Sequence, residues 1–338
     1  MESKKVAVLA SRFYRYGGIP RVVTRLLDNL EEIEGLEFDV ITSRTDFYWA
    51  ERVDADIKQI STYPHPVLSF FNPLTIRKME EYDLVWIHNT YLNRLSTILD
   101  TPTIATFHPP HRRYSSIFDF ERGVQATLES FLQERGLRYL QFTDRVVGIS
   151  DEVRERLTEH YKANAVRIYH GADLPASEKS ATSEEFIFAF AVDATVESVA
   201  EDYPVKALTS TGQIEEIEDK TDSGLISAIK RSKFVVSGSF QEGFGLEPVE
   251  AAFCGKPAVV RAVGGHEETI NHGETGYLAN NSKEFKKFVE KLWGDEALRE
   301  KMGGKAFERA KDKFTWRRAS LKYLEEFNDL MGTSFQLN

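Results

Sequence analysis

The chain has 338 residues, of which 41% are hydrophobic and 28% are charged, and its formal net charge is −10. This length allows two domains that each bury a core, and the composition is that of a globular protein rather than a disordered one. The acidic balance argues against general nucleic-acid binding, which needs a basic face, and the single cysteine excludes an intramolecular disulfide.

The first predicted elements are a strand, a glycine loop, a helix and a second strand. Val6–Ala10 is a continuously apolar run typical of a buried parallel strand, and residues 20–31 carry apolar side chains at helical spacing before the strand Phe38–Thr42. Two adjacent glycines, Gly17 and Gly18, lie between the first strand and the helix. The Gly-x-Gly-x-x-Gly fingerprint of dinucleotide-binding proteins is absent, so these glycines form either a plain turn or another ligand loop.

The apolar runs also bear on the compartment of the protein. The five apolar residues of Val6–Ala10 are too few for a secretion signal, and no run approaches the length that crosses a bilayer. A lone cysteine, Cys254, fits a reducing environment. The sequence therefore predicts a cytoplasmic protein.

A cationic and aromatic cluster precedes the two glycines. Its candidate binding residues are Arg12, Tyr14 and Arg15. Such a run is either a solvated surface or an acceptor site for an anionic or lipid-linked glycan, because basic and aromatic side chains favour anionic head groups at a membrane surface. The sequence leaves both interpretations open.

Three further strands are predicted, and a polar residue follows each. The strands and these residues are Asp83–Ile87 with His88, Thr103–Phe107 with His108, and Arg145–Ile149 with Ser150. Ligands bind at the carboxyl ends of the strands in a doubly wound sheet, so His88 and His108 are candidate site residues. His108 and His111 lie three positions apart, but no third ligand with zinc spacing follows, and no metal site is predicted. Ser150 is expected to cap a helix.

The most informative run of the second half extends from Glu242 to Pro257. Two carboxylates, Glu242 and Glu250, lie eight positions apart with a glycine-rich turn between them, and Pro248 predicts a helix start. Backbone N–H groups of such a turn bind anionic or hydroxyl-rich ligands, and carboxylates accept strong hydrogen bonds from hydroxyls. Gly255 fits the end of that helix, and Pro257–Val260 the next strand.

This run resembles the Glu-x7-Glu signature of retaining GT-B glycosyltransferases, in particular the family 4 group, also called glycosyl transferases group 1. Val263–Ile270 and Asn271–Leu278 continue the same pattern in order. The resemblance implies an α/β GT-B fold, with two Rossmann-like domains that face each other across a cleft. It also implies an N-terminal acceptor domain over 1–170, a C-terminal nucleotide-sugar donor domain over 171–315, and a helix over 316–338 that crosses back to the first domain.

The resemblance further implies an activity and a set of site residues. The chain would move a sugar from a nucleoside diphosphate sugar to a hydroxyl of a glycan, glycolipid or small molecule, with retention and without a metal or cofactor, in the cytoplasm or at the inner face of the membrane. His108 and Glu242 would face the sugar, and Glu250 would accept hydrogen bonds from the ribose hydroxyls. The other implied donor contacts are Gly17, Gly18, Gly243, Phe244, Gly245 and Leu246. The acceptor would lie near Arg12, Tyr14 and Arg15.

The segment between Asp173 and Glu242 departs from the family pattern. The family has an arginine and a lysine after a strand, where they hold the donor pyrophosphate, but here the predicted strand Phe186–Val192 is followed by Asp193. Residues 176–230 hold 12 acidic and 4 basic side chains, a net charge of −8. The interval is also short by one or two βα units, so a shortened C-terminal domain is expected.

Three interpretations of this departure stay open. Lys206 or Arg261 reaches the phosphates from another element, or helix N-termini and glycine amides hold them with help from the N-terminal arginines. Alternatively, the chain is a non-catalytic sugar- or nucleotide-binding GT-B protein that has lost the Arg/Lys pair. A GT-B epimerase or phosphorylase is a further rival, although no motif indicates the pyridoxal-phosphate lysine that a phosphorylase needs.

Overall fold

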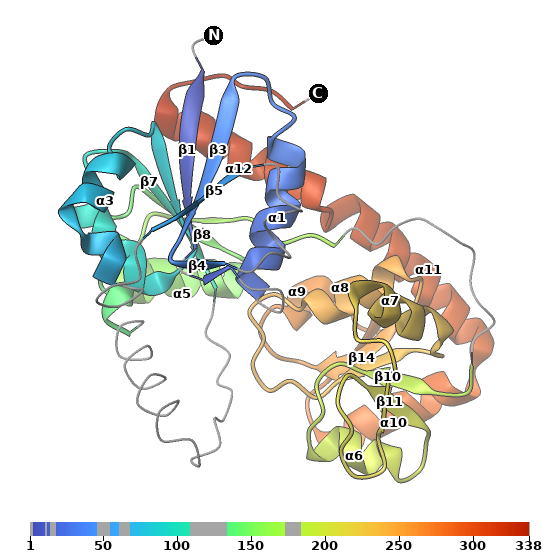
Figure 1. Cartoon of the computed structure of the whole chain (residues 1–338). Coiled ribbons are helices and arrows are strands. Elements are labelled where there is room, and N and C mark those ends of the chain that lie inside the picture. The colour runs from blue at the N-terminus through green and yellow to red at the C-terminus, as the bar shows by residue number, and fades with distance from the viewer. Residues whose placement is uncertain are drawn as a thin grey trace. The chain divides into compact units, whose positions relative to one another are not determined.

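A computed structural model describes residues 3–10, 12–13, 18–45, 55–60, 68–108, 134–172 and 184–337. The chain divides into two compact units, and each is built on a large parallel sheet with helices packed against it (Figure 1). The first unit comprises Met1–Tyr169 and Ala319–Asn338, and the second comprises His170–Arg318.

The sheet of the first unit has seven parallel strands in the order β5-β3-β1-β6-β7-β8-β9. The strands are β1 Lys4–Leu9, β3 Leu36–Thr42, β5 Asp56–Gln59, β6 Leu84–Ile87, β7 Thr103–Phe107, β8 Arg145–Gly148 and β9 Ala165–Arg167. The order runs outward from β1 in one direction and from β6 in the other, which is typical of a doubly wound sheet. A separate two-stranded pair joins β2, Arg12–Phe13, to β4, Arg44–Thr45.

The helices of the first unit follow the sequence pattern closely. Among the described residues they are α1 Gly18–Leu30, α3 Pro73–Met79, α5 Asp151–Tyr161, the 3-10 segments η1 Leu68–Phe71, η2 Thr90–Thr97 and η3 Leu140–Phe142, and α12 Trp316–Met331, which enters this unit at Ala319. The apolar stripe of α1 is buried, as its helical spacing predicts. Ser150 caps α5 by accepting a hydrogen bond of 3.2 Å from the Val153 N–H, which confirms its structural role.

Helix α12 supplies part of the core of the first unit. The Tyr323 hydroxyl lies 2.8 Å from Thr106 Oγ1 on β7, and Trp86 Nε1 on β6 donates to the same oxygen at 2.9 Å. This buried network fixes the helix against two central strands. Within the described part of the chain, no helix combines the length and apolar character that a bilayer span requires.

The sheet of the second unit has six parallel strands in the order β12-β11-β10-β13-β14-β15. The strands are β10 Ile187–Ala189, β11 Val205–Ala207, β12 Glu215–Glu216, β13 Val235–Ser237, β14 Ala258–Arg261 and β15 Gly276–Ala279. The helices are α6 Ala194–Ala200, α7 Asp222–Arg231, α8 Leu246–Phe253, α9 His266–Thr269, α10 Ser282–Gly294 and α11 Glu296–Lys313. The order again reverses at one point, between β10 and β13.

The segment between Asp173 and Glu242, which is shorter than the family pattern, contains short strands. Strands β10, β11 and β13 have 3 residues each and β12 has 2, and within the continuously described range 184–337 no helix links β11 to β12. The doubly wound strand order is nevertheless complete, so this unit has not lost a strand from that order. The predicted strand Phe186–Val192 is correspondingly reduced to Ile187–Ala189.

Helix α8 begins two residues earlier than Pro248 suggested. Gly245 is its N-cap in the left-handed region, with φ 87°, and Leu246 is the first helical residue. Pro248 is then the third helical residue, whose position still has no carbonyl partner for an N–H, so proline fits there as well. Gly255, with φ 67°, follows the end of α8, which confirms the predicted helix end.

Candidate functional site

The candidate site of the second unit lies where its strand order reverses. In doubly wound sheets ligands bind beyond the carboxyl ends of the two strands at that point, here β10 and β13. Asp193 follows β10, and Ser237 ends β13. A Cβ on Gly238 would lie 2.3 Å from Asp193 Oδ1, so the glycine lets the ends of the two strands approach closely.

The turn that connects β13 to α8 is fixed against the start of α9. The Gly265 N–H donates to the Glu242 carbonyl at 3.1 Å, and a Cβ on Gly265 would lie 2.3 Å from Phe244 Cα. A Cβ on Gly245 would lie 2.7 Å from His266 Cδ2. The two glycines therefore allow the turn that contains Glu242 to pack closely on the start of α9.

The two carboxylates of the signature differ in burial. Glu250 lies inside α8 and is only 3% exposed, whereas Glu242 is half-buried and its Oε1 accepts a hydrogen bond of 3.1 Å from the Gly243 N–H. The amides of Gly243, Phe244 and Gly245 lie in the same turn, just before the helix. The C-terminal unit thus brings together Glu242, Glu250 and the glycine-rich turn.

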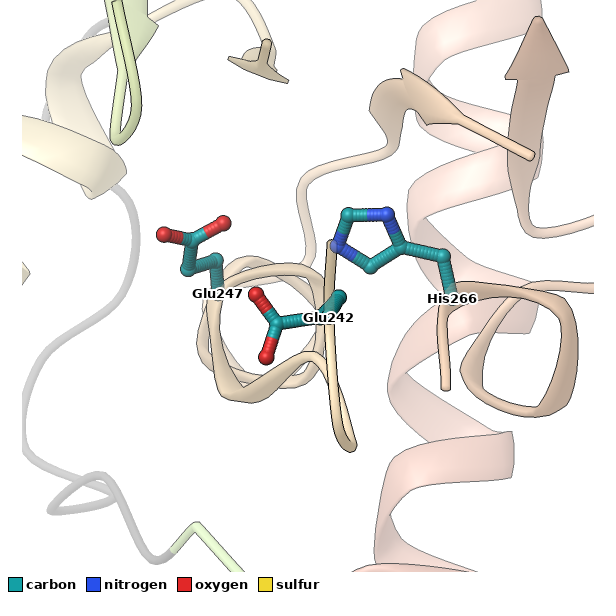
Figure 2. A group of neighbouring side chains, drawn as sticks. All are labelled: Glu242, Glu247 and His266. Atoms are coloured by element: carbon teal, nitrogen blue, oxygen red, sulfur yellow. The ribbon is translucent and has the colours of Figure 1, made fainter. Parts of the chain in front are cut away.

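Two residues that the sequence did not single out join this group. One carboxylate oxygen each of Glu242 and Glu247 and one ring nitrogen of His266 all lie within 4.8 Å of one another (Figure 2). Glu247 directly precedes Pro248, and His266 directly follows Gly265, so both residues belong to the runs that resemble the family pattern. A histidine and a third carboxylate beside a binding turn are the signal that could have identified them.

Burial and the neighbouring charge shift the pKa values of Glu247 and His266. Burial, helped by the nearby Glu242 charge, raises the pKa of Glu247 to about 8, although a 2.7 Å hydrogen bond from the Ser237 hydroxyl acts in the opposite direction. Burial lowers the pKa of His266, while the Glu242 charge acts in the opposite direction. His266 Nδ1 lies 3.0 Å from the Arg261 carbonyl oxygen. The group can therefore hold a proton or a metal ion.

Arg261 is the cation that the fold brings to the strand reversal. From the end of β14 its Nη2 contacts the Asp193 carboxylate and lies 2.7 Å from Thr195 Oγ1, and its Nε donates to the Gly238 carbonyl at 3.2 Å. The Arg261 and Asp193 side chains are 11% and 10% exposed. Asp193 therefore balances the charge of Arg261, which was one of two cations that could reach the phosphates.

Lys206 does not lie at this edge of the sheet. It is the middle residue of β11, its ammonium lies over the Phe186 ring at 5.0 Å, and it pairs with Glu215 at 3.6 Å. Phe186 precedes β10, so the lysine side chain is directed toward the amino ends of the strands. The prediction that Lys206 binds the donor is not supported by this position.

In the N-terminal unit, the structure brings the two strand-end histidines together. His88 Nδ1 lies 3.1 Å from His108 Nε2, and the rings stack with their centroids 5.4 Å apart. His88 is buried and His108 is half-buried. Gly18 is the first residue of α1. Gly17, Tyr14, Arg15, His111 and Asp173 lie outside the described residues, as does the Arg12 side chain.

The chain matches two family models and several curated relatives. Residues 16–175 match the model for Glycosyltransferase Family 4, and residues 203–309 match the model for Glycosyl transferases group 1. The trehalose synthase of Pyrococcus horikoshii is 35% identical over 139 residues, which are 41% of this chain and 32% of that protein. A glycosyltransferase of Methanocaldococcus jannaschii is 27% identical over 216 residues, 55% of this chain and 61% of that protein. The matches thus span less than two thirds of these relatives.

Solved structures match the fold over nearly the whole chain. Sucrose-phosphate synthase from Thermosynechococcus elongatus has a TM-score of 0.74 at 17% identity, and the match covers 98% of this chain and 100% of that one. HepE of Anabaena, solved in complex with UDP and glucose, has a TM-score of 0.74 at 16% identity, covering 96% and 99%. Together with the two doubly wound sheets, these matches confirm the predicted fold and family: the chain belongs to the family 4-like, group 1 glycosyltransferases of the GT-B fold.

Proposed function

We propose that the chain transfers a sugar from a nucleoside diphosphate sugar to an acceptor hydroxyl, with retention at the anomeric carbon. The observation that carries this proposal is the placement of Glu242, Glu250 and the glycine turn at the strand reversal of the second sheet. That edge is where doubly wound sheets bind nucleotides. The family membership supplies the reaction class, and the charged acceptors supply the means to hold hydroxyls.

Glu242 and Glu250 bind different parts of the donor. Glu250 is buried in α8 and accepts hydrogen bonds from the ribose hydroxyls, while the half-buried Glu242 and the turn amides hold the sugar hydroxyls. The family resemblance gives His108, which follows a strand of the N-terminal unit, a role in facing the transferred sugar. No side chain is assigned as a nucleophile, and the acceptor glycan, glycolipid or small molecule is assigned to the surface near Arg12, Tyr14 and Arg15.

The donor diphosphate needs compensating charge because negative charge grows on it as the sugar leaves. Arg261 lies at the carboxyl ends of the strands of the second sheet, where the donor would bind, but Asp193 balances its charge. The N-terminal groups of α8, which begins after its N-cap Gly245, provide positive partial charge at the same edge. These groups take the place of the arginine and lysine that the family uses.

Release of nucleoside diphosphate tests the proposed reaction. Wild-type protein and the Glu242→Gln variant are incubated with UDP-, GDP- and ADP-sugars and a mixture of glycan, glycolipid and small-molecule acceptors. We expect diphosphate release with one donor, an acceptor-dependent rate, and an NMR coupling constant showing the donor anomeric configuration in the product. Inversion would overturn the retaining assignment, and equal rates in the variant would overturn the role of Glu242.

A non-catalytic nucleotide-sugar-binding protein is the second candidate. Asp193 favours it, because an acidic residue follows the strand where the family has cations. Tight binding of a nucleoside diphosphate sugar without diphosphate release, across the whole acceptor panel, would establish this candidate in place of the transferase.

A further inference from the structure

The histidine pair of the N-terminal unit contains one residue to which the proposed transfer gives no role. His108, which follows β7, is assigned to the transferred sugar, whereas His88, which follows β6, is not assigned to anything. His88 is only 1% exposed and His108 is half-buried, so a ligand would contact His108 rather than His88. Any influence of His88 on the transfer therefore acts through His108.

The core of the first unit fixes both the backbone and the ring of His88. The His88 N–H donates to the Leu9 carbonyl of β1 at 3.0 Å, and the imidazole packs on Trp86 with the ring centroids 4.5 Å apart. Trp86 is held in turn by its 2.9 Å hydrogen bond to Thr106 and by two aromatic rings of α12, whose centroids lie 4.8 and 5.2 Å away. Because close-packed side chains have little freedom, the position of the His88 ring is set before any ligand binds.

The contact between the two imidazoles couples their protons. His88 Nδ1 lies 3.1 Å from His108 Nε2, and the ring planes are inclined by 26°. At this contact one nitrogen carries a proton and the other presents a lone pair. If His88 Nδ1 donates, both neutral rings carry their proton on Nδ1, and if His108 Nε2 donates, both carry it on Nε2. The contact thus permits only two of the four tautomer combinations of the neutral pair.

Packing alone does not account for a histidine at position 88. A phenylalanine would fill the space beside Trp86 without burying polar atoms, and buried polar atoms are unfavourable unless they are hydrogen-bonded. The hydrogen bond to His108 is what a nitrogen supplies and a phenyl ring does not.

We propose that His88 is a positioning residue, which holds the imidazole of His108 in a defined orientation and tautomer toward the transferred sugar. Misplacing a reacting group by about 1 Å can cost about 100-fold in rate, so a ring that is fixed before the donor binds favours transfer. The consequence for transfer rests on the proposed function, whereas the coupling of the two rings does not.

Nitrogen-15 NMR of the histidine-labelled full-length protein tests this coupling without any donor. At pH 8 ordinary imidazoles are neutral, so tautomers can be compared. The variants are His88→Phe, which keeps a ring but no nitrogen, and His88→Asn, whose amide provides a donor and an acceptor near the place of Nδ1. The exposed His160 of α5 gives the control His160→Phe. The His108 signals are assigned with His108→Asn, and circular dichroism and melting temperatures verify that each variant folds.

We expect the wild type to show a scalar coupling between His88 Nδ1 and His108 Nε2, and the same tautomer in both rings. His108 should populate both tautomers in His88→Phe, and one tautomer should again predominate in His88→Asn. Absence of the coupling in the wild type, opposite tautomers in the two rings, or an unchanged His108 in His88→Phe would overturn the inference.

Initial rates of diphosphate release measure the consequence for transfer. We expect kcat to be at least about tenfold lower in His88→Phe, and within about threefold of the wild type in His88→Asn and His160→Phe. The affinity for the nucleoside diphosphate alone should not change, because its contacts are assigned to the second unit. Unchanged kcat in His88→Phe would overturn the positioning role. If the wild type releases no diphosphate from any donor, the proposed function fails, while the NMR measurement still decides whether His88 fixes the His108 ring.

Discussion

Replacing Arg261 with methionine removes the cation of a nearly buried ion pair at the strand reversal. The side chains of Arg261 and Asp193 are 11% and 10% exposed, and the guanidinium also donates to Thr195 Oγ1 and the Gly238 carbonyl. Breaking such a pair by removing one partner costs about 3–5 kcal/mol, because the other charge stays buried. For a unit of this size, we expect the melting temperature to fall by roughly 10 °C.

A double-mutant cycle separates the ion pair from general packing. Asp193→Asn keeps an Oδ1 that accepts from the Thr195 and Val196 N–H groups at 3.1 and 2.9 Å, so the cap of α6 survives. The double variant should therefore be more stable than the sum of the single losses predicts, by more than about 1.5 kcal/mol. The four proteins are compared by calorimetric unfolding. A loss below about 1 kcal/mol in Arg261→Met, or additive losses, would refute this reasoning.

Three further predictions concern local structure. Gly245→Ala should destabilise the second unit by about 1–3 kcal/mol in urea unfolding, because φ is 87° and the new Cβ would lie 2.7 Å from His266 Cδ2; an unchanged midpoint would contradict this. Tyr323→Phe should cost about 1 kcal/mol by removing the hydroxyl beside Thr106, measured by thermal unfolding against the half-buried control Tyr161→Phe. Burial raises the pKa of Cys254 to about 12, so a thiol reagent at pH 8 should label it only after denaturation, and prompt labelling of the folded protein would oppose this.

The predictable part of the fold depended on local patterns. The strand before His108, the helix capped by Ser150 and the apolar face of α1 follow from neighbouring residues, and the structure has all three. The start of α8 was misplaced because a proline fits several early helical positions, whereas the left-handed Gly245 determines where the chain turns. The positive φ angle of Gly245 could not be predicted from the sequence pattern.

Which residues meet at the candidate site is determined by contacts between segments that are far apart in the sequence. Arg261 reaches Asp193 across 68 positions because β14 lies beside β13, which lies beside β10, and only the strand order reveals this. Lys206 is closer to Asp193 in the sequence than Arg261 is. Its side chain nevertheless lies over Phe186, away from the candidate site, because Lys206 is the middle residue of β11. His266 and Glu247 meet because the α8 turn packs on the start of α9, a contact between residues that the motif treats separately.

Calorimetric titration of UDP-, GDP- and ADP-sugars into the wild type and Glu250→Gln is the most direct test of the donor site. Loss of charge-assisted hydrogen bonds to the ribose costs about 1.5–3 kcal/mol, so we expect one donor to bind the wild type and to bind the variant about 10- to 150-fold more weakly. The variant must retain the wild-type melting temperature without ligand for this comparison. Equal affinities in the two proteins, or no binding of any nucleotide sugar, would contradict the assignment of this edge of the sheet as the donor site.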